Sequence, residues 1–225
     1  MNRQPIEVNE WYHCYNRGVD KRRVFLAKDD YERFLVLMYT GNSSVPAHTF
    51  HLKDKKLQAV LCDEGLERGE PIVEIGAYSL MPNHFHFVLK EIQKGGIALF
   101  MQKVFTGYTM YFNAKNERTG SLFAGTFKSK HIGKDDYLKR LVSYIHLNPA
   151  ELFDPTWKRG RGNIAAVERR LKKYPYSSLP DFLGVARMER RLLGNTMFEL
   201  FDSLPDARQI LEDARAYYAF TNTEV

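Results

Sequence analysis

An alternation of polar and apolar side chains in 84–90 is the clearest local pattern in this chain. His84 and His86 alternate with Phe85 and Phe87. Residues two apart in a strand leave it on the same face. We therefore predict a strand that points both histidines to one face and both phenylalanines to the other, into a core.

Shorter patterns predict further strands. The Pro82-Asn83 pair predicts a turn, so the apolar segment 72–80 is expected to pair antiparallel with 84–90. The aromatic segment 11–17 predicts a first strand, and 57–62 is a short strand candidate.

The segment 121–132 interleaves aromatic and basic residues and is predicted to be extended. This mixture suits single-stranded nucleic acid, because bases stack on aromatic rings and phosphates bind lysines such as Lys128 and Lys130. It equally suits an amphipathic strand that buries Phe123 and Phe127. The two interpretations are compatible.

Apolar positions three and four residues apart predict the helices. The first runs to about Tyr39 and is capped by Asp29 or Asp30. The others are expected at 95–113, 135–148, 187–204 and 207–220. The third begins at Asp135-Asp136, and Pro149 ends it because proline cannot continue a helix.

These elements predict an α/β fold, with a central antiparallel sheet and helices packed mainly on one face. We expect the histidine strand to be central and the 135–148 helix to lie across the sheet. Residues 1–184 would form the main domain, with an irregular insertion at about 41–71. Residues 185–225 would form a helical C-terminal extension.

Composition narrows the class of protein. The chain has 225 residues, 33 Lys plus Arg against 27 Asp plus Glu, and a formal net charge of +6. That excess is consistent with a polyanionic partner. The two cysteines are too few for a disulfide framework or a zinc cluster. No signal peptide or membrane span is predicted, so we expect a cytoplasmic, nucleoid-associated protein with no membrane partner.

Two imidazoles on adjacent same-face positions of a strand can chelate one divalent cation. The alternative is a pair of solvated polar side chains on an exposed strand face. Tyr144 and Asn148, four residues apart on the 135–148 helix, share one face of it. Tyr144 flanks the apolar stripe, so a buried structural tyrosine is an open alternative. His146 points away from Tyr144 and is interpreted as a packing or surface residue.

The His-Phe-His strand, followed later by a helix carrying Tyr-Ile-His-Leu-Asn-Pro, resembles the single-tyrosine HUH transposases. The closest branches are the IS200-like and REP-associated tyrosine transposases. The resemblance covers about Trp11 to Gly184 and implies a ferredoxin-like HUH fold. The segment 174–184 resembles the end of the family's domain.

The resemblance implies a metal-dependent enzyme that cleaves and rejoins single-stranded or hairpin DNA. Tyr144 would be the catalytic nucleophile and would form a 5′-phosphotyrosine. His84 and His86 would hold Mg²⁺ or Mn²⁺, with Asn148 at the position of a third ligand. The resemblance also favours phosphate contact by a basic cluster that would otherwise be a solvated turn. The candidate DNA-binding residues are Arg17, Lys21, Arg22, Arg23, Lys128 and Lys130.

Two other functions remain open at the level of the sequence. One is a domesticated hairpin-binding protein or repressor that does not cut DNA. The other is a metal-dependent phosphohydrolase in which Tyr144 is structural and water attacks. Either a monomer or a homodimer fits the resemblance, and the longer C-terminal tail favours a monomer.

Overall fold

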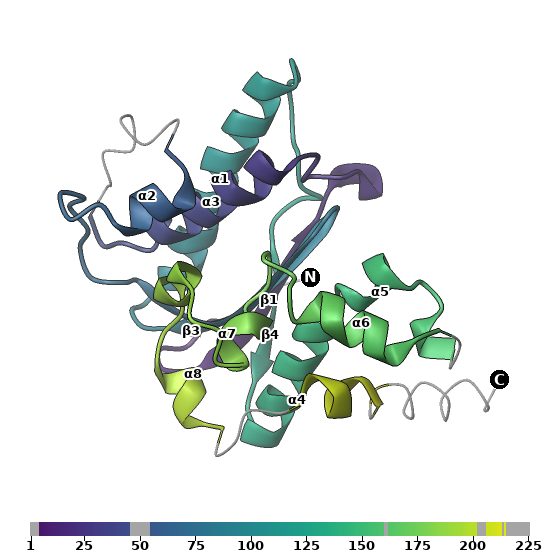
Figure 1. Cartoon of the computed structure of the whole chain (residues 1–225). Helices are drawn as coiled ribbons and strands as arrows, with labels where there is room; N and C mark the ends of the chain where they lie inside the picture. Colours follow the sequence, from purple (N-terminus) through teal and green to yellow (C-terminus); the bar gives the residue numbers. More distant parts are fainter. Residues whose placement is uncertain (1–4, 46–54, 160–161, 202–205, 213, 215–225) are drawn as a thin grey trace.

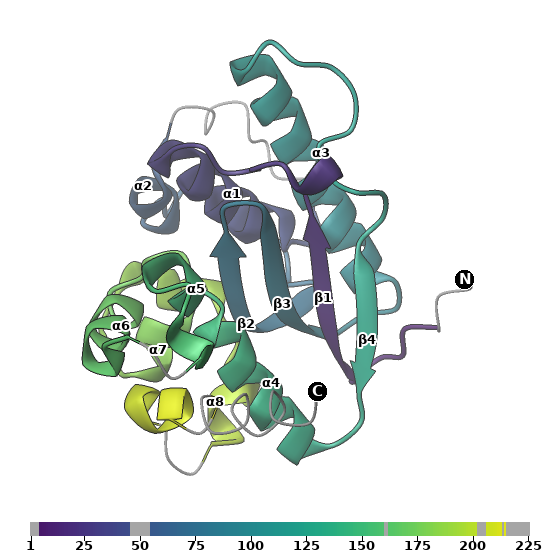
Figure 2. The same cartoon turned by 90° about the vertical axis from the view of Figure 1, so that its right-hand side faces the viewer.

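The computed structural model describes residues 5–45, 55–159, 162–201, 206–212 and 214. Its centre is a four-stranded antiparallel sheet with the strand order β2-β3-β1-β4 (Figure 2). The strands are β1 (Trp11–Arg17), β2 (Val73–Met81), β3 (His84–Glu91) and β4 (Lys128–Ile132). The predicted class is confirmed, and β3 and β1 are the two central strands.

Helices lie on both sides of this sheet, which Figure 1 shows nearly edge-on. The two long helices that connect strands, α1 and α3, share one side with the short α2. The helix α4 crosses the other side, where the shorter C-terminal helices gather. The bounds are α1 (Lys28–Gly41), α2 (Leu57–Leu61), α3 (Gly96–Lys115), α4 (Asp135–Leu147), α5 (Ala150–Phe153), α6 (Ile164–Leu171), α7 (Leu179–Phe182) and α8 (Thr196–Glu199), with 3-10 turns η1 (Val19–Lys21), η3 (Trp157–Arg159) and η4 (Met188–Leu192). The order β1-α1-β2-β3-α3-β4 is the ferredoxin-like arrangement.

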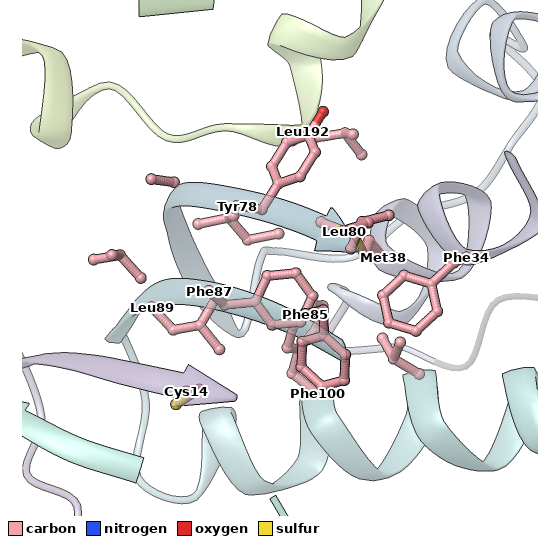
Figure 3. Close-up of a cluster of buried hydrophobic side chains, with 14 of the residues drawn as sticks. Cys14, Phe34, Met38, Tyr78, Leu80, Phe85, Phe87, Leu89, Phe100 and Leu192 are labelled. Carbon is pink, nitrogen blue, oxygen red and sulfur yellow. The ribbon is translucent and has the colours of Figure 1, made fainter. Parts of the chain in front are cut away.

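The apolar face of β3 packs against the helices α1 and α3. Phe85 and Phe87 are fully buried against Phe34 of α1, and Phe100 of α3 completes the contact (Figure 3). Burying each such ring stabilises the fold by about 1.5–3 kcal/mol. Because β3 alternates, this burial fixes its orientation and leaves His84 and His86 on the opposite face.

The start of α1 differs from the prediction. Neither Asp29 nor Asp30 is the N-cap, because the helix begins at Lys28 after an extended Ala27. The Asp30 carboxylate reaches back from the first turn and accepts hydrogen bonds from the backbone N–H groups of Leu26 (2.8 Å) and Ala27 (2.9 Å). Asp30 therefore still provides a hydrogen-bond acceptor for backbone N–H groups at the start of the helix, although it lies within the first turn.

The predicted strand at 57–62 is wrong, because Leu57–Leu61 forms the helix α2. Leu57, Val60 and Leu61 are buried, and their three-and-four spacing suits a helix packed against α1. The extended segment expected at 121–132 is a strand only over Lys128–Ile132. Residues 46–54 of the predicted insertion lie outside the described residues.

The prediction of a single helix at 187–204 is also wrong, because this segment contains two separate short elements. The 3-10 turn η4 ends at an extended Leu193 (φ −99°, ψ 144°), and α8 follows. The backbone N–H of Gly194 donates to the carbonyl of Ile75 on the edge of β2 (3.0 Å). Leu192, Leu193 and Met197 join the main core, so docking on the sheet outweighs helix continuation. Residues 207–212 of the second predicted tail helix are helical, and 215–225 lie outside the described residues.

None of the helices in the described ranges is both long and apolar enough to cross a membrane. The proposed boundary between residues 184 and 185 stays a prediction. Side chains beyond it, such as Leu192 and Met197, pack into the same core as the sheet.

Candidate active site

The histidine pair lies where the hairpin of β2 and β3 turns. Pro82 and Asn83 separate the two strands, and the Asn83 side-chain oxygen is 2.7 Å from Nδ1 of His84. The rings of His84 and His86 lie side by side on one face, with centroids 5.2 Å apart and planes at 87°. The strand alternation therefore places the two imidazoles together as predicted.

The helix α4 brings Tyr144 and Asn148 to the same place. Its apolar residues Leu138, Leu141, Val142 and Ile145 are buried against the rest of the fold, which leaves Tyr144 at the margin of that contact. The Tyr144 ring is 6.0 Å from the His86 ring, centroid to centroid, and the residue is 45% exposed. A fully buried structural tyrosine is thus contradicted.

Asn148 is the C-cap residue of α4, one turn after Tyr144. Its side-chain nitrogen donates to the Tyr144 carbonyl (2.9 Å), which directs the side-chain oxygen away from α4. The Asn148 side chain is also near enough to the His84 imidazole to raise its pKa. The four candidate residues, predicted from the two distant segments 84–86 and 144–148, are therefore neighbours in space.

His13 belongs to the same group and was missed by the sequence reasoning. Its Nε2 is 2.9 Å from Nδ1 of His86. Its ring contacts those of Tyr15 (centroids 4.8 Å apart) and His86 (5.1 Å), which also contact each other (5.8 Å). Strand β1 pairs with β3 so that Tyr15 opposes His86. The alternation in 11–17 puts His13 and Tyr15 on one face, but no local signal identifies β3 as the neighbouring strand.

Burial keeps these imidazoles neutral at pH 7. It lowers the pKa of His86 to about 3, with smaller effects from His13 and His84. Burial and then the Lys130 charge lower the pKa of His13 to about 4. The pKa of His84 is also lowered, chiefly by burial, although the neighbouring Asn148 side chain opposes the shift. Neutral imidazole is the form that binds a metal ion.

The donor set fits a divalent cation that keeps open positions. Nδ1 of each histidine is occupied by a protein partner, Asn83 or His13, so Nε2 is the nitrogen of each ring that would bind a cation. The described part of the chain contains no group of three or more His, Cys, Asp or Glu side chains able to hold a metal ion. Two imidazoles and one amide oxygen therefore need ligands from substrate or water.

An open cleft of about 470 Å³ extends from His86 between the sheet and α4. Its walls combine aromatic rings, imidazoles and two basic side chains from three strands and one helix. The lining residues are His13, Tyr15, His86, Lys130, Tyr137, Arg140, Leu141 and Tyr144. Tyr15, Tyr137 and Arg140 were not singled out from the sequence, although Arg140 is one turn before Tyr144 on α4.

The predicted DNA-binding residues lie at two places around the histidines. Arg17 opposes His84 across the sheet, and the exposed Lys21 and Arg23 follow in the turn beside it. The Asn83 side chain donates to the Lys21 carbonyl (3.4 Å), so this turn adjoins the hairpin turn. Half-buried Arg22 is partly structural, because its Nε donates to the Val19 carbonyl (3.2 Å).

The other basic residues follow β4. Lys130 opposes His13 and lines the cleft, with its ammonium 5.2 Å from the Tyr137 ring centroid. Lys128 opposes Tyr15 and is exposed. Both lysines share the sheet face of the histidines. His146 is buried on the other side of α4 and its Nε2 is 2.8 Å from Ser178 Oγ, so it is a packing residue.

Comparisons with known proteins found one family model and a similar solved structure. The family model described as transposase IS200 like matches residues 55–148, which confirms the resemblance over that segment. The match contains the histidine pair, the tyrosine and Asn148, and it leaves out His13. Among solved structures, a REP-associated tyrosine transposase bound to a REP hairpin is similar, with 13% sequence identity, coverage of 84% of this chain and 88% of that chain, and a TM-score of 0.48. A comparison with curated proteins gave no match.

Proposed function

We propose that this relative of the IS200-like transposases cleaves and rejoins single-stranded DNA next to a hairpin, through a covalent tyrosine intermediate. The observation that carries the proposal is the meeting of four side chains from two distant segments, of which His86 and Tyr144 line an open cleft. His84 and His86 come from β3, Tyr144 comes from α4, and Asn148 is the C-cap residue of α4.

The charge around the cleft supports a nucleic-acid substrate. Lys130 and Arg140 line it, and Arg17 lies on the same sheet face next to His84. Single-stranded DNA combines phosphates for such cations with bases that stack on aromatic rings. Tyr15 and Tyr137 provide rings within the same walls. A folded hairpin would bring its single-stranded flank to this cleft while its duplex rests on the basic turn at 21–23.

Tyr144 would act as the nucleophile. Its phenolic oxygen forms a bond to the scissile phosphorus as the bond from phosphorus to the 3′ oxygen breaks. The phenol gives up its proton and the leaving 3′ oxygen gains one, so a 5′-phosphotyrosine and a 3′-hydroxyl result. The reverse reaction with another 3′-hydroxyl rejoins DNA without an external energy source. The exposure of Tyr144 (45%) allows a phosphate to approach the ring.

His84, His86 and Asn148 would hold the divalent cation, Mg²⁺ or Mn²⁺. A bound cation would stabilise negative charge on the phosphate and would favour loss of the phenolic proton, since a free phenol has a pKa of about 10. Two neutral imidazoles bind Mg²⁺ weakly, so we expect tighter binding of Mn²⁺. The protein contributes the fixed ring orientations, because Asn83 and His13 engage the Nδ1 atoms.

The test uses a labelled DNA hairpin with single-stranded flanks, incubated with the full chain and Mn²⁺. We expect an adduct that survives denaturing electrophoresis. Tyr144→Phe removes the nucleophilic oxygen and should abolish the adduct while hairpin affinity stays within about twofold. Tyr137→Phe is the matched control, because Tyr137 lines the same cleft on the same helix, and it should keep the adduct.

Two outcomes would overturn the proposal. Cleavage that persists in Tyr144→Phe would identify water as the nucleophile and make the protein a phosphohydrolase. Tight hairpin binding by the unmodified chain, with neither adduct nor cleavage across a panel of flanking sequences and both metals, would identify a binding protein or repressor.

A further inference from the structure

A second cleft lies between α5 and α6, outside the candidate active site. It has a volume of about 380 Å³, and Phe153, Arg169, Arg170, Lys173, Tyr174 and Pro175 line it. We call it the α5–α6 cleft. Three of its six lining residues are cations, two are aromatic, and none is acidic.

The cations of this cleft are available to a ligand. Arg169, Arg170 and Lys173 are exposed, and none forms an ion pair among the described residues. Lys172 differs, because its ammonium is 2.5 Å from a Glu168 carboxylate oxygen. The charge of Lys172 is therefore neutralised by an acidic side chain, whereas the three cations that line the cleft have no such partner in the part of the chain that the structure describes.

The aromatic part of the cleft is held in place by the fold. The Tyr174 hydroxyl donates to the carbonyl of Leu80 on β2 (2.6 Å), and the rings of Tyr174 and Phe153 meet at 73° with centroids 5.9 Å apart. The Arg170 guanidinium lies 4.4 Å from the Phe153 ring centroid. The Phe153 ring therefore already interacts with a cation, and a planar base is another group that such a ring can bind.

The α5–α6 cleft is close to the active site along the chain. Helix α5 begins two residues after Asn148 and ends at Phe153, which is roughly 7 Å of helix. Glu151, in the middle of α5, is near enough to His84 to affect its pKa. Figure 2 shows α5 and α6 side by side next to α4 and the β2 edge of the sheet. Two or three nucleotides would span this distance.

We propose that the α5–α6 cleft binds the single-stranded DNA that flanks the hairpin, a few nucleotides from the bond that Tyr144 attacks. A base would stack on Phe153, sharing it with or displacing Arg170, and phosphates would bind Arg169 and Lys173. Duplex DNA offers only phosphates to this cleft, since its bases are already stacked. This inference rests on the proposed function and names which part of the substrate reaches beyond the active site.

The test measures binding without chemistry, by fluorescence anisotropy of Tyr144→Phe with no added metal. The probes are one hairpin with no flank and the same hairpin with flanks of two, four or six nucleotides on the 5′ or the 3′ side. We expect a flank on one side to strengthen binding by about tenfold, as for one stacked base and its phosphates. The double variant Arg169→Gln/Lys173→Gln, and separately Phe153→Leu, should remove most of that gain and leave affinity for the unflanked hairpin unchanged.

Salt dependence provides a second measurement. Removing two phosphate contacts should lower the slope of log affinity against log salt by about 1.4 for the flanked hairpin. Lys172→Gln is the matched control, because its charge is already paired with Glu168, and it should change neither quantity. Circular dichroism melting checks the fold of each variant, and the double charge variant alters only exposed side chains.

The two proposals fail in different ways. If the chain does not bind the unflanked hairpin, the proposed function itself is in doubt. If it binds that hairpin but gains nothing from either flank, or if the double variant keeps the whole gain and the salt slope, the α5–α6 cleft is not a DNA site. Retention of the gain by a folded Phe153→Leu variant would likewise exclude base stacking there.

Discussion

His13→Leu is the substitution that most directly tests how the candidate site is built. The change keeps a side chain of similar bulk and removes the nitrogen that lies 2.9 Å from Nδ1 of His86. His86 then has no partner at Nδ1 and its ring is free to turn. We expect weaker Mn²⁺ binding, although His13 is not itself a proposed ligand.

The magnitude follows from two losses. A buried neutral hydrogen bond contributes about 0.5–1.5 kcal/mol, and fixing a ring that is otherwise free costs about another 0.5–1 kcal/mol. The sum is about 1–2.5 kcal/mol, which corresponds to a loss of roughly 5- to 70-fold in metal affinity, close to the range that is typical for partners of metal-binding histidines. His13→Gln places an amide where it can still hydrogen-bond His86 and should recover most of the affinity.

Titration of free Mn²⁺ by electron paramagnetic resonance, with and without hairpin DNA, measures this affinity directly. His131→Leu is the matched control, because His131 lies on β4 opposite Tyr12, on the other face of the sheet. It should leave Mn²⁺ binding unchanged. A folded His13→Leu protein that binds Mn²⁺ within twofold of the native chain would refute the reasoning. If His13→Leu instead abolishes Mn²⁺ binding as completely as His84→Ala does, His13 is itself a metal ligand and the reasoning is also refuted.

Two further predictions concern the scaffold. Asp30→Asn should destabilise the fold by about 2–4 kcal/mol in urea denaturation, because one amide cannot replace a fully buried carboxylate that pairs with Lys115. Burial alone would raise the pKa of Asp30, but Lys115 and the backbone donors lower it overall. The ionised Asp30 carboxylate therefore stabilises the fold fully above its unfolded pKa of about 3.9. This stabilisation is lost as the pH falls through the lower pKa of the folded state. Asp30→Asn should lose this acid dependence, and an unchanged slope of stability between pH 5 and 2.5 would contradict the assignment. Gly76→Ala should cost about 1–3 kcal/mol, because the added Cβ would lie 2.4 Å from Met197 Cε and 2.7 Å from Trp11 Cζ3; an unshifted melting temperature would exclude such tight packing at the β2 bulge.

Local periodicity in the sequence was enough to predict the central sheet strands and the faces of the site elements. The alternation in 84–90 assigns His84 and His86 to one face whatever the strand pairs with, because side chains in a strand alternate by geometry. The helical period likewise places Tyr144 and Asn148 together on α4. These predictions depend only on backbone geometry and on burial of one apolar face.

Only the tertiary structure decided which of these faces meet. The pairing of β1 with β3 brings His13 against His86, and docking of α4 over the sheet brings Tyr144 beside the same ring. The segments 57–62 and 187–204 were mispredicted because contacts with α1 and with the edge of β2 outweigh their local preferences. Strand order and helix docking depend on contacts between residues far apart in the chain, and local periodicity carries no information about such contacts.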